Sequence, residues 1–175
     1  MSIRDTEAAW LAGFLEGEGT FQVVETRKTG SGPIYEAQIA ATNTAYAALE
    51  RCHEIAGGWL YGPIGRGNAK WKPAYRWTLR GKALGPVLRA LIPHLVAKRE
   101  PALILLCLRE EITVGANVNE WGRKPLGADV LARRTDYKMA MHALNHRGAL
   151  PTPQEQTEAL ARIHPQLEAI AATVA

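Results

Sequence analysis

The sequence contains few cysteines, no long apolar run and no repeated segment. Two cysteines in 175 residues, Cys52 and Cys107, are too few for a disulfide framework. The longest apolar stretch, residues 102–108, is far shorter than the ~20 residues needed to cross a bilayer, and the first residues lead into no apolar signal segment. We therefore expect a soluble, reduced, intracellular protein with no membrane partner.

Several catalytic signatures are missing too. The chain has no P-loop, no dinucleotide fingerprint and no pattern typical of a Ser or Cys nucleophile triad. Its length suits one domain with a proper core. The net charge of +4 is uneven, because residues 149–175 hold three glutamates and one arginine, a net −2, which leaves +6 on residues 1–148. A polyanionic partner fits this balance.

The most informative segment that is present is residues 10–19, Trp-Leu-Ala-Gly-Phe-Leu-Glu-Gly-Glu-Gly. Its pattern predicts an apolar helix that ends near Gly17 and Gly19, since glycine is costly inside a helix and favoured just past one. Gly13 and Gly17 are four apart, a spacing that lets a second helix backbone approach closely. The helix ends on the carboxylate of Glu18, beside carbonyls with negative partial charge, which favours a divalent cation.

This run resembles the signature of the LAGLIDADG homing endonucleases, which cleave DNA and occur in introns, inteins and phage genomes. Nine positions are in register, with Glu in place of Asp at 16 and 18 and Gly in place of Ala at 17. Residues 92–98, Ile-Pro-His-Leu-Val-Ala-Lys, are similar to a later segment of the family. The resemblance implies a site-specific double-strand DNA endonuclease in a bacterial or phage cytoplasm or an organelle.

Turn residues and alternation divide the chain into helices and strands in a definite order. We predict a helix from residues 5–6 to 19, strands at 20–28 and 34–42, a helix from Asn43 or Thr44 to 56, strands from 59 and at 74–80, and helices at 81–95 and 98–113. This αββαββα order predicts an α+β core over residues 1–115, with a four-stranded antiparallel saddle on DNA. We expect residues 116–175 to form a helical extension, in the same domain or appended. The sequence leaves its role open, and an extended DNA contact through the basic helix at 129–146 is one hypothesis.

Glu18 is the main catalytic candidate. Phosphodiester hydrolysis is accelerated by cations that stabilise the phosphate and the leaving oxygen. Mg²⁺ needs only one or two protein carboxylates, because waters and substrate phosphates supply its other ligands. The resemblance implies that Glu18 and the Gly17 carbonyl bind Mg²⁺, for which Mn²⁺ could substitute. Glu16 is two residues away and cannot share the helical face of Glu18, so we place it at the dimer edge or bonded to a partner's backbone.

The resemblance adds two further active-site candidates, Lys98 and Asn43. Lys98 would stabilise charge near the scissile phosphate; its alternative interpretation is a solvated lysine at a helix start. Asn43 would position a water molecule; its alternative interpretation is an N-cap of the helix that follows.

Alternation along the strands predicts a polar sheet face that reads DNA. The even residues of the first strand and of the strand at 74–80 lie on this face, and the loop at 65–72 adds basic residues that suit phosphates. The predicted DNA contacts are Gln22, Thr26, Lys28, Arg66, Asn68, Lys70, Arg76 and Thr78.

One copy of the motif supplies one Glu18, whereas cutting two strands requires two. We therefore predict a homodimer through the first helix, with Leu11, Gly13, Phe14 and Gly17 at the interface, and a long pseudo-palindromic target. Two alternatives remain open: a non-cleaving nucleic-acid binder such as a maturase or transcription regulator, and a protein-interaction domain that uses the motif helix as a dimer zipper. The target bases, the host element (intron, intein or free-standing gene) and the retention of cleavage with two glutamates stay open.

Overall fold

The computed structural model describes residues 3–28, 32–64, 72–114, 118–119, 122–123, 127–145 and 152–174. Helices and strands follow one another in the predicted order up to the fourth long helix. The elements are α1 (Asp5–Glu18), β1 (Gly19–Lys28), β2 (Gly32–Asn43), α2 (Tyr46–Ala56), β3 (Trp59–Ile64), β4 (Ala74–Arg80), η1 (Gly81–Ala83), α3 (Leu84–Leu91), η2 (Ile92–His94), α4 (Arg99–Val114), β5 (Val118–Asn119), β6 (Gly122–Arg123), α5 (Ala128–Leu144) and α6 (Pro153–Ala172).

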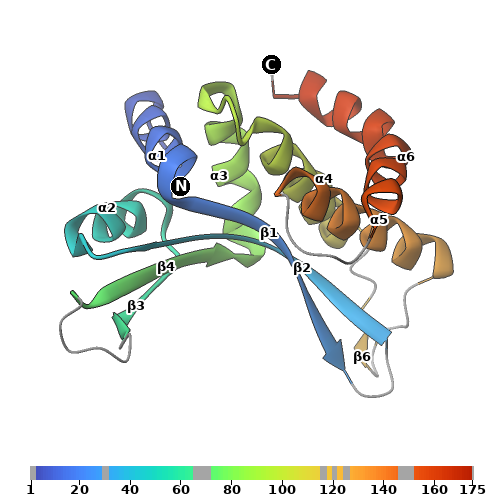
Figure 1. Ribbon diagram of the computed structural model, residues 1–175, viewed down its shortest axis with the longest axis horizontal. Coiled ribbons are helices and arrows are strands. Elements are labelled where there is room, and N and C mark those ends of the chain that lie inside the picture. Colours follow the sequence, from blue (N-terminus) through green and yellow to red (C-terminus); the bar gives the residue numbers. More distant parts are fainter. Residues whose placement is uncertain are drawn as a thin grey trace.

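The four long strands form one antiparallel sheet in the order β1-β2-β4-β3. The helices lie on one side of this sheet, above the arching strands in Figure 1, and no described helix covers the opposite face. The predicted α+β class and the four-stranded antiparallel sheet are thus confirmed. Among the described residues, none of the helices has the length and apolarity that a bilayer crossing requires.

The covered face of the sheet holds the hydrophobic core. Phe21, Ile39, Trp77 and Leu79 point into it and are fully buried, each at an alternate position of its strand. Trp77 also donates its indole N–H to the Gly57 carbonyl at 2.8 Å, which ties the end of α2 to β4. Burial of these large side chains fixes the register of the strands, because a slip of one residue would expose all of them.

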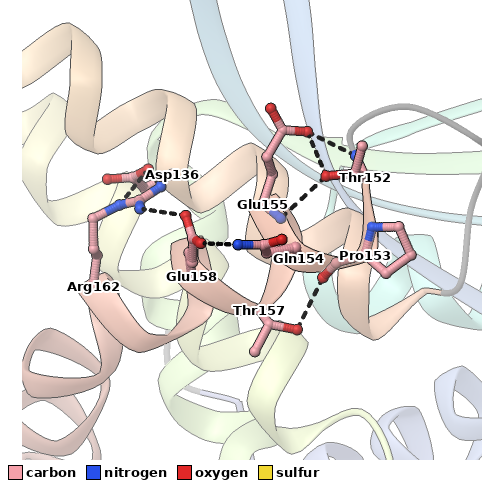
Figure 2. Close-up of polar contacts among 8 residues, drawn as sticks. All are labelled: Asp136, Thr152, Pro153, Gln154, Glu155, Thr157, Glu158 and Arg162. Atoms are coloured by element: carbon pink, nitrogen blue, oxygen red, sulfur yellow. Dashed lines mark hydrogen bonds and ion pairs between the residues drawn. The ribbon is translucent and has the colours of Figure 1, made fainter.

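The helices α5 and α6 pack onto the same core. Tyr137, Met141, Ile163 and Leu167 belong to one hydrophobic cluster with the sheet and α4. Figure 2 shows how α6 begins: Thr152 Oγ1 accepts the N–H of Glu155 at 3.3 Å, and the Glu155 carboxylate accepts the N–H of Thr152 at 2.8 Å. This reciprocal capping box satisfies two backbone N–H groups that the first turn leaves without partners.

An ion pair fastens α6 to α5. Arg162 Nη2 donates to Asp136 Oδ1 at 2.7 Å, as Figure 2 shows. Pro165 lies inside α6, and the helix is continuous through it rather than interrupted. Pro165 is exposed, so the peptide group that loses its hydrogen bond there faces water.

The predicted single helix at residues 81–95 is wrong. The segment divides into η1, α3 and η2, so only eight residues form regular α-helix. Gly81 has a φ of 74°, outside the helical range, and Pro93 removes an N–H near the other end. The start of α2 was also predicted too early, because its N-cap is Ala45 rather than Asn43 or Thr44.

Candidate functional site

The motif helix α1 ends as the sequence predicts. Glu18 is its last residue, and its side chain is exposed. Gly19 follows in an extended conformation, and a Cβ there would lie 2.6 Å from the Leu15 carbonyl oxygen. Glycine is therefore required at 19 by the close approach of the helix end rather than by an unusual φ, and the chain can pass directly from α1 into β1.

Lys98 lies against this helix end. Its Nζ donates to the Leu15 carbonyl at 2.7 Å and to the Gly19 carbonyl at 2.6 Å. A cation here neutralises the negative partial charge of the helix C-terminus. Burial lowers the pKa of Lys98, and the negative charges of Glu16 and Glu18 partly oppose that shift. Two of the predicted catalytic residues, 80 positions apart in the chain, are thus brought to one place.

Glu16 holds the segment that carries Lys98. Its Oε1 accepts the N–H of Val96 at 2.7 Å and the N–H of Lys98 at 3.2 Å. Glu16 was predicted to lie at the dimer edge or to bond a partner's backbone. The hydrogen bonds of its Oε1 are to the backbone of its own chain, because η2 and the residues that link η2 to α4 lie beside the last turn of α1. Glu16 therefore orients the backbone from which Lys98 projects.

Asn43 has a local role at the end of β2. Its Oδ1 accepts the N–H of Ala45 at 2.9 Å, just before α2 begins, which is close to the capping interpretation. Gly19 pairs with Ala41 across the sheet, so Asn43 stands two residues along β2 from the partner of Gly19, about 6.6 Å.

Oxygen donors at the end of α1 are the candidates for binding a metal ion. Across the described ranges, no three His, Cys, Asp or Glu side chains gather closely enough to hold a metal ion. The end of α1 offers one exposed carboxylate, from Glu18, and the backbone carbonyl of the neighbouring residue Gly17, itself an exposed residue. Oxygen donors of this kind suit Mg²⁺, which retains several waters, so the residues fit such an ion when a second set of ligands joins them.

Trp10, Gly13, Phe14 and Gly17 follow one another at helical spacings of three and four residues and form a strip along α1. A Cβ added at Gly13 or Gly17 would meet nothing within 4 Å, so neither glycine packs against its own chain. Beside them the rings of Trp10 and Phe14 stack, with centroids 5.7 Å apart, and Trp10 is 41% exposed. Leu11 was wrongly predicted to belong to this strip: it is 0% exposed because it points into the core.

The uncovered sheet face carries the polar residues that the alternation predicts. Directly opposed residues of antiparallel strands lie on the same face. Gln22 pairs with Gln38, and Gln38 pairs with Arg80. Arg76 is four residues from Arg80 in β4, so it shares the face of Gln22, as the DNA-binding prediction requires.

The other predicted DNA contacts divide into three groups. Thr26 is exposed on this face, and its hydroxyl lies 3.5 Å from the Ile34 carbonyl. Thr78 is only 5% exposed, so its side chain is unavailable to a partner although it lies on this face. The backbone of Lys28 pairs with Gly32 at the end of β1, whereas its side chain, like Arg66, Asn68 and Lys70, lies outside the described residues.

Sequence reasoning missed two exposed aromatic residues on this face, Trp59 and Tyr61. They pair with Thr78 and Arg76 in β4, and they are 47% and 46% exposed. The signal was the register of the β3–β4 pair, which alternation within β3 alone does not reveal.

The arrangement of elements is shared with known structures, although no family model and no curated protein matches the sequence. The homing endonuclease I-CvuI, crystallised with DNA, is 17% identical, with a TM-score of 0.66 over 91% of this chain and 95% of its own. The archaeal intron-encoded homing endonuclease I-Vdi141I, also complexed with DNA, is 16% identical, with a TM-score of 0.67 over 93% of this chain and 97% of its own. The LAGLIDADG homing endonuclease I-LtrWI aligns with a TM-score of 0.55 and 17% identity, over 80% of this chain and 43% of its own.

The chain has the LAGLIDADG homing endonuclease fold. The resemblance seen in residues 10–19 is thereby confirmed at the level of the fold, and α1 is its motif helix. The match covers almost the whole length of I-CvuI and of I-Vdi141I as well as most of this chain. The shared fold therefore includes both α1 and the open sheet.

Proposed function

We propose that this protein is a site-specific double-strand DNA endonuclease that hydrolyses phosphodiester bonds with a divalent metal. One observation carries the proposal. The exposed carboxylate of Glu18 ends α1, the ammonium of Lys98 is bonded to carbonyls at the same helix end, and the polar open face of the sheet begins there with β1. A duplex lying on that face would pass the end of α1. The excess positive charge of residues 1–148 suits such a polyanion.

The structural neighbours support this proposal. I-CvuI was crystallised on DNA in the presence of Mg²⁺ in one case and of Ca²⁺ in another. I-Vdi141I and I-CeuI were crystallised as complexes with DNA. These are properties of the neighbours, and we extend them to this chain on the basis of its Glu18, Lys98 and open sheet face.

The chemistry follows from the donors at the end of α1. Glu18 and the Gly17 carbonyl would hold Mg²⁺, or Mn²⁺ in its place, and such an ion stabilises charge on the phosphate and the leaving oxygen. The Lys98 ammonium would stabilise the negative charge that develops on the phosphate oxygens. Asn43, whose carbonyl oxygen is engaged by Ala45, would hold a water through its amide N–H groups.

A homodimer completes the site. We infer that the strip of Trp10, Gly13, Phe14 and Gly17 packs against its copy across a two-fold axis, which brings two Glu18 carboxylates together. The target would then be a long pseudo-palindrome. We assign residues 116–175 to a helical extension of the same domain, since α5 and α6 share its core.

Gly13→Leu tests this assembly. An isobutyl group on the strip would hold the two backbones apart, so the variant should be monomeric by light scattering and should cut no duplex. Ala132→Leu, at an exposed position of α5, is the matched control and should behave like the wild type. A Gly13→Leu protein that is dimeric and active would refute the interface.

Glu18→Gln tests the chemistry. The substitution preserves the shape of the side chain and removes the charge that binds Mg²⁺, so cleavage of plasmid DNA should fall by several orders of magnitude. Folding, dimerisation and DNA affinity should be unchanged, because the strand contacts remain. Undiminished Mg²⁺-dependent nicking would overturn the mechanism, and tight duplex binding by a wild type that never cuts would identify a non-cleaving binder.

A further inference from the structure

We propose that Trp59 and Tyr61 of β3 contact the 5-methyl groups of thymines in the major groove of the target duplex. The inference rests on the proposed function and names a feature of its substrate. Both residues are among the exposed large apolar side chains of the described structure, with almost half of each side chain accessible. Side chains of this size are normally buried, and exposed apolar groups that gather at one place mark interaction sites.

The register places both rings on the face that would meet DNA. Trp59 pairs with Thr78, and Tyr61 pairs with Arg76. Opposed residues share a face, and this is the face that carries Arg76 and Gln22. The rings therefore look away from the core and toward whatever lies on the open sheet.

The neighbouring charges favour nucleic acid over an apolar protein partner. The Arg80 guanidinium lies over the Trp59 ring, 5.2 Å from its centroid, and also pairs with Glu36 at 3.4 Å. Arg76 beside Tyr61 is exposed and has no ion-pair partner among the residues that the structure describes. Aromatic rings between two arginines suit the groove of a polyanion.

The same geometry favours a small apolar group over a stacked base. One face of the Trp59 indole is already taken by the Arg80 guanidinium, which leaves the other face and the ring edge. The free face and edge of the ring offer enough apolar surface to contact one methyl group. Among the four bases, only thymine presents a methyl group in the major groove, and apolar side chains recognise it there.

The spacing of the two rings predicts where the thymines lie. Two residues of a strand span about 6.6 Å, close to the rise of two base pairs at about 3.4 Å each. If β3 follows the groove, the two contacted thymines are separated by about two base pairs. Gln22 and Arg76 would read neighbouring base edges by hydrogen bonds, which leaves the methyl groups to the rings.

Replacement of thymine by deoxyuridine tests the inference directly, because uracil lacks only the 5-methyl group. The full-length wild-type protein, in Ca²⁺, is used to select duplexes from a random-sequence library. The recovered duplex is then resynthesised with deoxyuridine at one thymine at a time. At one or two positions the Kd should rise about fourfold for each methyl removed, the effect of burying one such group.

Two variants assign the effect to the rings. In Trp59→Ala and in Tyr61→Ala, the penalty for deoxyuridine should vanish at the position that each ring contacts and persist at the other. Tyr46→Ala is the matched control, because Tyr46 is equally exposed (42%) but lies in α2 on the helical side, against Tyr75. It should leave every deoxyuridine penalty unchanged.

The outcomes separate this inference from the proposed function. A wild type that binds duplex DNA with no deoxyuridine penalty at any position overturns the inference alone, and this result needs no variant to fold. Tighter binding to single-stranded DNA or RNA than to duplex would show that the rings stack on unpaired bases, and it also overturns the inference. A wild type that binds no nucleic acid overturns both.

Discussion

Two regions of the molecule use their charged side chains in opposite ways. In the helical layer, cations of α5 and α6 are paired with acids of other elements: Arg133 and Arg134 with Glu111, Lys138 with Glu25, and Arg162 with Asp136. At the end of α1 and on the open sheet face, Glu18 and Arg76 form no ion pair with any residue that the structure describes. Charges of the first kind hold the fold together, whereas those of the second kind remain available to a partner.

The same contrast applies to the basic helix at residues 129–146, for which an extended DNA contact was one hypothesis. Arg133, Arg134 and Lys138 are instead engaged with acids of the same chain, and Arg134 is only 6% exposed. Their charges were visible in the sequence, but their partners lie 22 to 113 positions away along the chain.

The largest expected effect in the helical layer comes from Glu111→Ala. Glu111 accepts Arg134 Nε at 2.9 Å and Arg133 Nε at 2.7 Å. Its removal leaves the buried Arg134 guanidinium without a counter-charge, so the free energy of unfolding should fall by about 3–5 kcal/mol. Urea titration followed by circular dichroism measures this loss. Arg162→Ala is the control, since the pair of the exposed Arg162 with Asp136 should contribute far less to stability; equal losses in the two variants would contradict the distinction.

The next effect concerns Lys98. Its ammonium is bonded to backbone carbonyls, so it belongs neither to the ion-paired charges nor to the available ones. Lys98→Met should slow cleavage by about 10² while leaving Mg²⁺ binding intact. Since burial lowers the pKa of Lys98, its ammonium loses the proton at a lower pH than an exposed lysine would. Cleavage by the wild type should therefore decline on the alkaline side sooner than cleavage by Lys98→Arg, whose charge persists. Identical pH profiles of the two proteins would show that deprotonation of Lys98 does not cause the alkaline decline.

The smallest effect is expected at Arg76, an available charge with no structural task. Arg76→Ala should weaken binding to the selected duplex by about 1–3 kcal/mol and relax the base preference at one position. Its urea midpoint should match that of the wild type. Fluorescence anisotropy with labelled duplex measures the first quantity. A loss of stability without a loss of affinity would place Arg76 with the paired charges of the helical layer.

Much of the fold could be predicted because it depends on local patterns. The end of α1 at Glu18, the four strands and the two faces of β1 and β4 follow from glycine positions and alternation. The failures have physical causes as well. Residues 81–95 look helical by composition, yet Gly81 and Pro93 divide them, and Leu11 and Thr78 match the interface patterns but are buried by neighbours that the local sequence does not specify.

Backbone propensity and side-chain period act over a few residues, so they already specify which residues lie at the tip of α1 and which side chains share a strand face. Long-range packing, in contrast, brings Lys98 to that tip, lets Glu16 hold the segment of Lys98, and places Trp59 and Tyr61 with Arg76 on the open face. Each of these depends on contacts between residues far apart in the chain, roughly 15 to 80 positions, and packing of the whole core sets such distances. The pattern of residues within one helix or strand does not specify such long-range contacts.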